Sequence, residues 1–365
     1  MVKKVTRSVN VEKNMKKIIK NVNLYGKTVD IAVSDGKIAE IGESLGDGED
    51  FAGAKIYPGL IDVHSHGCIG ADTMDSELAE MADYYLEHGI TTWYPTTMTM
   101  SEEEIIAACD RNIDLGHGAN IPGFHMEGPF INIKYKGAQN GEYVIPPSME
   151  LFNKCKNVKM VTIAPEVEGS MEFIRECPAV VSIGHTDTDY DTAMRAFECG
   201  AKCLTHTYNV MPGIHHRAPG PIPAGADAGA YAQLICDGVH VHPSAVRMLV
   251  KLYGADKVVL ISDSMRATAL GDGKYAFGGQ TITVTEGRAF TEGGNLAGST
   301  TNLFDCVRCA IKFGIPEYDA VKMASENPAR MMGLNKGKIE VGYDADFIIV
   351  DENFNLVKAI AGGRF

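Results

Sequence analysis

Short apolar runs rich in β-branched residues alternate with longer segments of helical periodicity along most of the chain. This alternation is typical of parallel β-strands, each followed by a helix that returns the chain to the start of the next strand. Eight such runs are present, at residues 60–64, 91–95, 121–125, 158–163, 179–183, 202–205, 232–236 and 257–261. Eight successive βα repeats predict an α/β protein with a TIM-like (β/α)8 barrel.

The two ends of the chain have a different pattern, because short alternating strands and Gly or Asp turns replace the helical segments. A β-hairpin insertion near residues 275–291, turning at Glu286-Gly287, also interrupts the βα pattern after the eighth strand. The chain is therefore expected to divide into a basic N-terminal extension at residues 1–17, a small β-sandwich domain from residues 18–57 and 338–365, and the barrel at residues 58–337.

Composition and charge narrow the functional classes. Hydrophobic residues make up 45% of the 365 residues and charged residues 22%, which is typical of a folded globular protein. The formal net charge of −13 argues against a protein that neutralises nucleic-acid phosphates or coats an anionic membrane. The nine cysteines have no paired spacing, and neither a secretory signal nor a membrane-length apolar stretch is recognisable, so we expect a cytoplasmic protein with free thiols.

Side chains of the types that bind metals stand at the carboxyl ends of the predicted strands. In a barrel these ends meet at one mouth, where active sites are built, so residues far apart in sequence can share one site. Imidazole nitrogens together with a carboxylate oxygen form a donor set for zinc, iron or manganese. The pattern therefore predicts a metal centre at the mouth, built from His64, His66, Glu127, His185, His206 and Asp263.

Each member of this set has a simpler explanation when it is taken alone. The spacing of His64 and His66 points both imidazoles to one face of a strand, but two such histidines can be ordinary core or surface residues. A lone carboxylate such as Glu127 usually forms a salt bridge or a cap. Asp263 could cap a helix, whereas beside a metal-activated water it is the natural general base. The common placement at strand ends favours the catalytic interpretation.

Several longer motifs resemble the amidohydrolase superfamily. They are Pro58-Gly59-Leu60-Ile61-Asp62-Val63-His64-Ser65-His66, Glu127-Gly128-Pro129, Asn327-Pro328-Ala329-Arg330 and Gly342-Tyr343-Asp344-Ala345-Asp346. Within the superfamily, four segments resemble the N-acetylglucosamine-6-phosphate deacetylases, at residues 124–130, 184–186, 206–212 and 237–240. The resemblance extends from about residue 18 to residue 365 and leaves the first 17 residues uncovered.

The resemblance implies a role for each residue at the predicted mouth. Glu127, His185 and His206 match the principal metal ligands of the family, and Asp263 matches its catalytic acid and base. The His-x-His pair of the first strand matches ligands of an additional metal that only some members bind. The family therefore implies one or two divalent cations per subunit, and these donors accept zinc, iron, manganese or cobalt.

The resemblance also implies a shell of residues around a phosphorylated amino sugar. Asn209 and the backbone of Val210 match positions that hold the sugar phosphate, while Arg217 and His240 match phosphate ligands contributed across the interface of a homodimer. A dianionic phosphate needs such donors in an otherwise acidic protein. Further substrate contacts are expected at Ala138, Gln139, Asp237, Leu296, Ala297 and Gly298.

Gln139 departs from the family pattern. Many members have a histidine there, which polarises the acetyl carbonyl of the substrate. Glutamine can donate a neutral hydrogen bond from this position, but it cannot carry a positive charge. We therefore expect a second cation on His64 and His66 to take over part of this polarisation.

The function implied by the resemblance is hydrolysis of the N-acetyl group of N-acetylglucosamine 6-phosphate, in amino-sugar catabolism and recycling. The same scaffold could act on the C4 epimer, N-acetylgalactosamine 6-phosphate, or could be a cyclic amidase or a nucleobase deaminase. The phosphate shell argues against the last two. Outside enzymes, a metal-free relative could only bind a phosphosugar or support an assembly, but the complete ligand set argues against this alternative. No nucleic-acid or membrane partner is expected.

Overall fold

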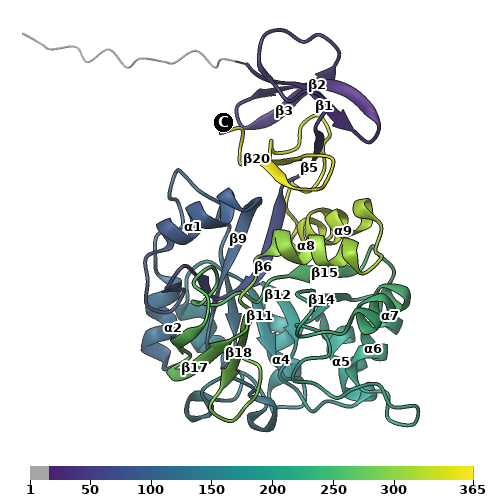
Figure 1. Cartoon of the computed structure of the whole chain (residues 1–365). Helices are drawn as coiled ribbons and strands as arrows, with labels where there is room; N and C mark the ends of the chain where they lie inside the picture. Colours follow the sequence, from purple (N-terminus) through teal and green to yellow (C-terminus); the bar gives the residue numbers. More distant parts are fainter. Residues whose placement is uncertain (1–15, 365) are drawn as a thin grey trace, which may run out of the picture.

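Eight parallel strands form the centre of the computed structural model, which describes residues 16–364 (Figure 1). Their hydrogen-bonded order follows the chain: β6 (Leu60–Ser65), β9 (Ile90–Thr97), β10 (Phe124–Glu127), β11 (Val158–Ile163), β12 (Val180–Ile183), β13 (Cys203–Leu204), β14 (Tyr231–Ile235) and β15 (Val258–Ile261). Near the carboxyl ends of β15 and β6, the backbone N–H of Asp263 donates to the carbonyl of His64 at 2.9 Å, which joins the last strand to the first. The predicted barrel is confirmed.

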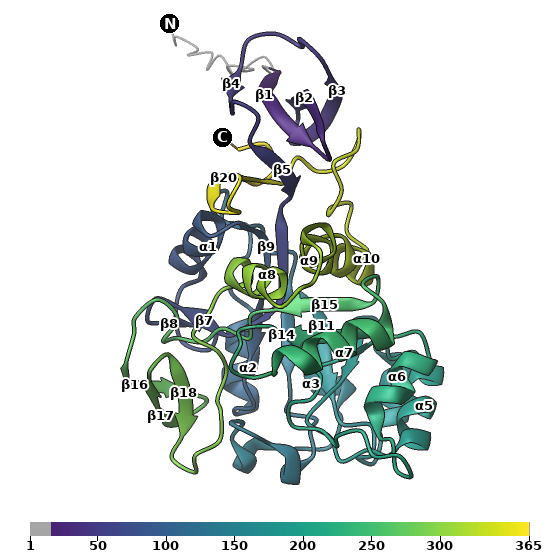
Figure 2. The same cartoon turned by 45° about the vertical axis from the view of Figure 1, so that its right-hand side comes forward.

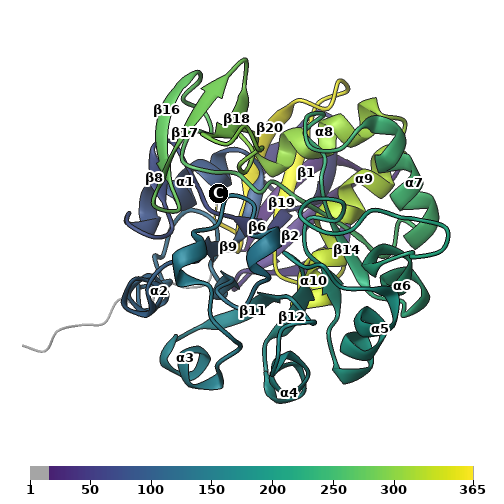
Figure 3. The same ribbon diagram turned by 90° about the horizontal axis from the view of Figure 1, so that it is seen from below.

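Helices surround the strands, as the view from below shows (Figure 3). They are α1 (Leu78–Glu87), α2 (Glu102–Cys109), α3 (Met149–Lys154), α4 (Ser170–Glu176), α5 (Tyr190–Cys199), α6 (Pro221–Asp227), α7 (Pro243–Tyr253), α8 (Leu303–Lys312), α9 (Glu317–Ala324) and α10 (Glu326–Met332). A capping box of Ser101 and Glu104 satisfies backbone N–H groups at the start of α2. Within residues 16–364, no helix has both the length and the apolar character needed to cross a lipid bilayer.

The barrel strands are buried along nearly their whole length, which explains their continuous apolar sequences. Every residue of β15 is buried and apolar, and all eight residues of β9 are buried. Such strands pack against helices on their outer face and against side chains of other strands inside the barrel. Polar side chains such as Thr162, Gln233 and Ser262 are also buried, near the carboxyl ends of the strands where the site lies.

The two ends of the described chain form a second, smaller sheet above the barrel (Figures 1 and 2). Its strands are β20 (Leu356–Ile360), β19 (Phe347–Val350), β5 (Lys55–Pro58), β1 (Lys17–Leu24), β2 (Lys27–Ser34) and β3 (Lys37–Gly42), with β4 (Glu49–Asp50) paired to β1. The antiparallel pairing of β19 with β5 joins the late segment of the chain to the early one. This confirms the predicted small β structure built from both segments. Residues 1–15, which hold most of the predicted basic extension, lie outside the described residues.

A three-stranded antiparallel sheet occupies the predicted hairpin insertion. It consists of β16 (Gly273–Phe277), β17 (Gln280–Thr285) and β18 (Arg288–Thr291). The turn lies at Glu286-Gly287, where both φ angles are positive, at 51° and 70°, as a two-residue turn of type I′ requires. Phe277 packs in a small core with Met98 and Met265, so the inserted sheet is anchored beside the carboxyl ends of β9 and β15.

We predict that Leu260→Ala lowers the free energy of unfolding by about 2–5 kcal/mol, because this β15 side chain is fully buried and its removal leaves a cavity. Leu252→Ala on α7 is the matched control, since that side chain is 45% exposed and the same truncation should cost far less. Urea unfolding followed by circular dichroism measures both changes. Equal losses in the two variants would contradict this account of the barrel core.

Candidate metal centre

Three of the predicted site residues come from strands β6 and β10. His64 lies within β6, His66 follows the end of that strand, and Glu127 is the last residue of β10. All three side chains are buried. Because side chains alternate along an extended strand, His64 and His66 both face the barrel mouth. The two-residue spacing thus directs both imidazoles to the same side of the chain, as expected from the sequence.

The other three residues, His185, His206 and Asp263, each lie two positions beyond β12, β13 and β15, respectively. Their φ angles are 48°, 28° and 49°, in a region that residues other than glycine rarely occupy. Such strain costs on the order of 1–3 kcal/mol and clusters at functional sites. The sharp change of direction after each strand accompanies the burial of these three side chains at the mouth.

Glu127, His185 and His206 form a compact donor group. The Nε2 atoms of the two histidines lie 3.3 Å and 3.1 Å from Oε1 of Glu127, and 3.1 Å from each other. Two imidazole nitrogens and a carboxylate oxygen in this arrangement provide three protein ligands for a divalent metal and leave further positions for water or substrate.

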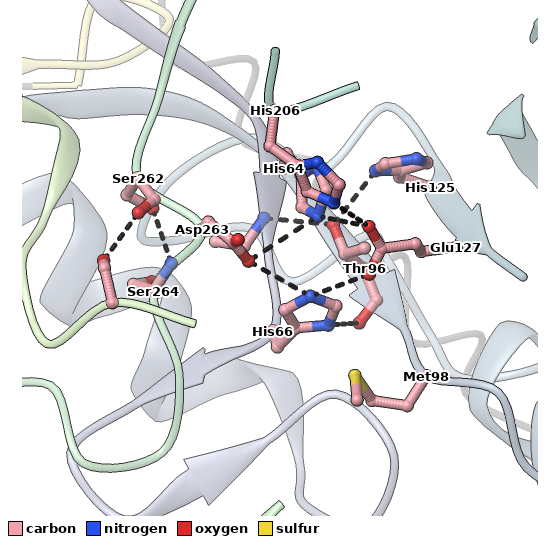
Figure 4. Close-up of polar contacts among 12 residues, drawn as sticks. His64, His66, Thr96, Met98, His125, Glu127, His206, Ser262, Asp263 and Ser264 are labelled. Carbon is pink, nitrogen blue, oxygen red and sulfur yellow. Dashed lines mark hydrogen bonds and ion pairs between the residues drawn. The ribbon is translucent and has the colours of Figure 1, made fainter. Parts of the chain in front are cut away.

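His64 and His66 form a second donor group with the same carboxylate (Figure 4). His66 Nε2 lies 3.3 Å from Oε2 of Glu127, while His64 Nε2 lies 3.2 Å from Oε1. Asp263 Oδ1 approaches the same two nitrogens, at 3.3 Å from His66 and 3.7 Å from His64. Glu127 belongs to both groups, so the mouth offers donors for one or two cations.

Hydrogen bonds on the far side of the imidazole rings direct their Nε2 atoms toward the shared carboxylate. Nδ1 of His185 lies 2.9 Å from the carbonyl oxygen of Tyr135, and Nδ1 of His66 lies 3.1 Å from that of Thr96. A carbonyl only accepts, so each Nδ1 carries a proton and each Nε2 faces Glu127, where it can carry a second proton or give its lone pair to a metal ion. Lone pairs and carboxylate oxygens that converge in this way repel one another unless a positive charge lies among them. The donors therefore fit a divalent cation.

Burial and the neighbouring histidines have opposite effects on the pKa values of Asp263 and Glu127. Burial would raise the pKa of Asp263, but the charge of His64 and the hydrogen bond from His66 outweigh burial and lower this pKa. Burial also tends to raise the pKa of Glu127, whereas the charges of His64 and His185 hold it well below its ordinary value. Both carboxylates are therefore ionised at neutral pH, so Glu127 can bind a cation and Asp263 can accept a proton.

A cavity of about 420 Å³ opens at the two donor groups, within the size range of small-molecule sites. The predicted residues that line it are His66, Glu127, Ala138, Gln139, His185, His206, Asn209, Val210, His240, Asp263, Leu296 and Gly298. Val210 has a φ of 48°, which is unusual for a β-branched residue and again marks strain at this site. The structure thus brings most of the predicted substrate residues to the metal-type donors.

Three predicted substrate residues lie away from this cavity. Arg217 is exposed and contacts His216, and Ala297 belongs to the small core beneath the inserted sheet. Asp237 contacts His240 at 2.7 Å and does not line the cavity itself. His240 lines the cavity of its own chain.

The sequence reasoning missed a loop with two lysines. Lys134, Tyr135 and Lys136, in and after the 3₁₀ helix η1 (Ile133–Tyr135), line the cavity. Lys136 is half-buried and donates to the carbonyl of Gln139 at 3.1 Å, but no carboxylate in residues 16–364 pairs with it. The Lys-x-Lys-Gly run is the signal in the sequence that could identify this loop.

Comparisons with known proteins relate the chain to a family of hydrolases. The amidohydrolase family model matches residues 56–365. The N-acetylglucosamine-6-phosphate deacetylase of Lysinibacillus sphaericus is 36% identical, over 95% of this chain and 97% of that protein. The N-acetylgalactosamine-6-phosphate deacetylase of Escherichia coli O157:H7 is 34% identical, over 82% of this chain and 85% of that protein.

A solved structure shares the whole architecture. It is a mutant N-acetyl-D-glucosamine-6-phosphate deacetylase from Mycobacterium smegmatis in complex with N-acetyl-D-glucosamine-6-phosphate. The two structures superpose with a TM-score of 0.90 at 27% sequence identity, and the match covers 96% of this chain and 98% of the other. The likeness includes both the barrel and the small sheet, because so little of either chain is left out.

The contact of His240 with Asp237 generates a prediction about protonation. Burial lowers the pKa of His240, but the hydrogen bond and the charge of Asp237 outweigh burial and raise this pKa above 6.5. We predict that Asp237→Asn moves the titration midpoint of His240 downward, because the charge that opposes burial is lost. NMR titration, with His240→Gln to assign the resonance, measures the midpoint.

The raised pKa of His240 also determines how its contribution to folding stability changes with pH. Because the folded pKa of His240 is raised, its contribution is complete below the unfolded pKa and is lost as the pH rises through the folded pKa. The stability difference between the protein and Asp237→Asn should therefore shrink as the pH rises through that range. A midpoint that does not move in Asp237→Asn would contradict the assignment.

Proposed function

Because the chain belongs to the amidohydrolase family, we propose that it hydrolyses the N-acetyl group of N-acetylglucosamine 6-phosphate to glucosamine 6-phosphate and acetate. The enzyme is thus a metal-dependent hydrolase of a carbon–nitrogen bond in a linear amide. The observation that carries the proposal is the arrangement of two metal-type donor groups around Glu127, with Asp263 beside them at the wall of the cavity.

The proposal includes one or two divalent cations per subunit. Glu127, His185 and His206 would hold the principal cation, and His64 and His66 would hold a second one with the shared carboxylate. Zinc, iron, manganese and cobalt all accept these nitrogen and oxygen donors. A divalent cation supplies Lewis acidity here, which lowers the pKa of water toward about 7 and polarises a carbonyl group.

Asp263 is the proposed acid and base. Its ionised carboxylate takes a proton from the water that attacks the acetyl carbon. As the carbon–nitrogen bond breaks, the protonated Asp263 passes this proton to the leaving amine nitrogen, so that water and amide become acetate and an amino sugar. Its side chain is buried beside His66, which holds it at the reacting end of the cavity.

The phosphate of the substrate has its own set of proposed partners. Asn209, the backbone of Val210 and His240 line the same cavity as the donor groups and would hold the phosphate. Lys136 adds an ammonium group without a carboxylate partner among the described residues. Arg217 of the partner subunit would complete the set in a homodimer. Such contacts position the sugar, so their loss raises KM and can also lower kcat.

We place this activity in amino-sugar catabolism and recycling in the cytoplasm. In support, the nine cysteines are all free thiols, as is usual in a reducing compartment. No nucleic-acid or membrane partner forms part of the proposal.

A second candidate substrate is the C4 epimer, N-acetylgalactosamine 6-phosphate. It is favoured by one observation, the 34% identity to an N-acetylgalactosamine-6-phosphate deacetylase. We predict faster acetate release from the gluco than from the galacto compound, measured on one purified sample whose metal content is determined by elemental analysis. Acetate release from neither compound by metal-loaded protein would refute the proposed function, and a preference for the galacto compound would replace the substrate.

We predict that Asp263→Asn keeps its metal and its substrate affinity but loses at least about a hundredfold in kcat, because an amide cannot take up the proton. Acetate release under saturating substrate measures kcat, and elemental analysis of the same sample provides the control. A near-normal rate in this variant would show that another group acts as the base.

A further inference from the structure

Gln139 contacts the carboxylate on which both donor groups depend. Its side chain is 2% exposed, and its Nε2 donates to Oε2 of Glu127 at 2.7 Å. We propose that Gln139 is a positioning residue, which holds the Glu127 carboxylate in the orientation that serves both donor groups. This inference rests on the proposed metal site, and it assigns Gln139 a role separate from the one expected from the family pattern.

The orientation of the Gln139 amide follows from its second contact. Its Oε1 accepts a hydrogen bond from the backbone N–H of Thr99 at 2.6 Å. An amide turned by 180° would set two donors against each other at Thr99 and two acceptors against each other at Glu127. The backbone N–H of Thr99 therefore determines that the amino group of Gln139 faces the carboxylate.

Thr99 is itself held close to the strand end that carries Glu127. Gly128 follows Glu127 with a φ of 70°, and a Cβ built at this glycine would lie 2.1 Å from Oγ1 of Thr99. Only glycine allows this approach. The side chain of Thr99 after β9 and the backbone after β10 are thereby brought together, and Gln139 joins Thr99 to Glu127 through its amide.

The hydrogen bond fixes which carboxylate oxygen faces which histidine. Oε1 of Glu127 lies within 3.3 Å of Nε2 of His64, His185 and His206, while Oε2 lies 3.3 Å from Nε2 of His66. A carboxylate free to rotate about its terminal bond would lose this division. Gln139 remains uncharged at every pH, so it holds Oε2 without adding a positive charge that would repel a cation.

The inference differs from the role of a donor to the acetyl carbonyl. A carbonyl donor acts only when substrate is present, whereas a positioning residue affects cation binding to the free protein. Removal of a residue that hydrogen-bonds to a metal ligand typically weakens metal binding by about 10–100-fold. Zinc binding to the metal-stripped full chain, without substrate, therefore separates the two roles.

The test compares two substitutions with a matched control. Gln139→Ala removes the side chain, and Gln139→Met keeps its length without hydrogen-bonding groups, so failure of one variant to fold leaves the other available. Gln280→Ala is the control, because Gln280 donates to the carbonyl of Ala138 in the same loop but not to Glu127. Circular dichroism checks the folding of all three, and competition with a chelator measures their zinc affinity.

We expect both Gln139 variants to bind zinc about 10–100-fold more weakly than the unchanged protein, and Gln280→Ala to bind it within about twofold. Unchanged zinc affinity in the Gln139 variants would overturn the inference. An equal loss in Gln280→Ala would also overturn it, because a displaced loop would then explain the effect. The zinc measurement needs no substrate, so it tests the role of Gln139 independently of catalysis. Absence of acetate release would refute the proposed function and would leave the zinc result unaffected.

Discussion

The buried negative charge of Glu127 is the constraint on which the rest of this structure depends. Glu127 is 2% exposed, and the Nε2 atoms of four histidines lie within 3.3 Å of its oxygens. A carboxylate removed from water in this way costs several kcal/mol unless opposite charge and hydrogen bonds compensate it. The compensating groups come from the ends of three other strands, β6, β12 and β13, and no local segment could supply them. The site therefore forms only when the barrel closes.

Packing and polar contacts connect this charge to the rest of the fold. The imidazoles are held from behind by Thr96 and Tyr135, and the Nδ1 of His64 lies 3.1 Å from Oε1 of Gln233 on β14. On the outer side, the ring of Phe277 from the inserted sheet lies edge-on to His66, with centroids 5.3 Å apart. The strands thus supply the ligands, while the loops and the insertion restrict their movement and their contact with water.

The barrel and its metal-type residues could be predicted from the sequence because both leave local signals. Continuous apolar runs mark strands buried on both faces, and histidines or acids directly after such runs mark the mouth. The third strand, β10, begins at Phe124 rather than at residue 121, because residues 121–123 form the loop that precedes it. Contacts such as that between Gln139 and Glu127 depend on how the loops fold over the mouth, and the hydrophobic pattern of the sequence does not predict loop conformation. The position of Lys136 is hidden for the same reason.

The pairing of β5 with β19 has a consequence for biosynthesis. β5 is made early and leads directly into β6, but its antiparallel neighbour is made only after the whole barrel has been translated. Until then, Ile56 and Tyr57 lack their strand partners, so the nascent polypeptide carries an open sheet edge. A translation product that stops before β19 lacks this pairing, which leaves backbone groups of β5 available to pair with another chain. The small sheet is therefore complete only in a chain that includes β19.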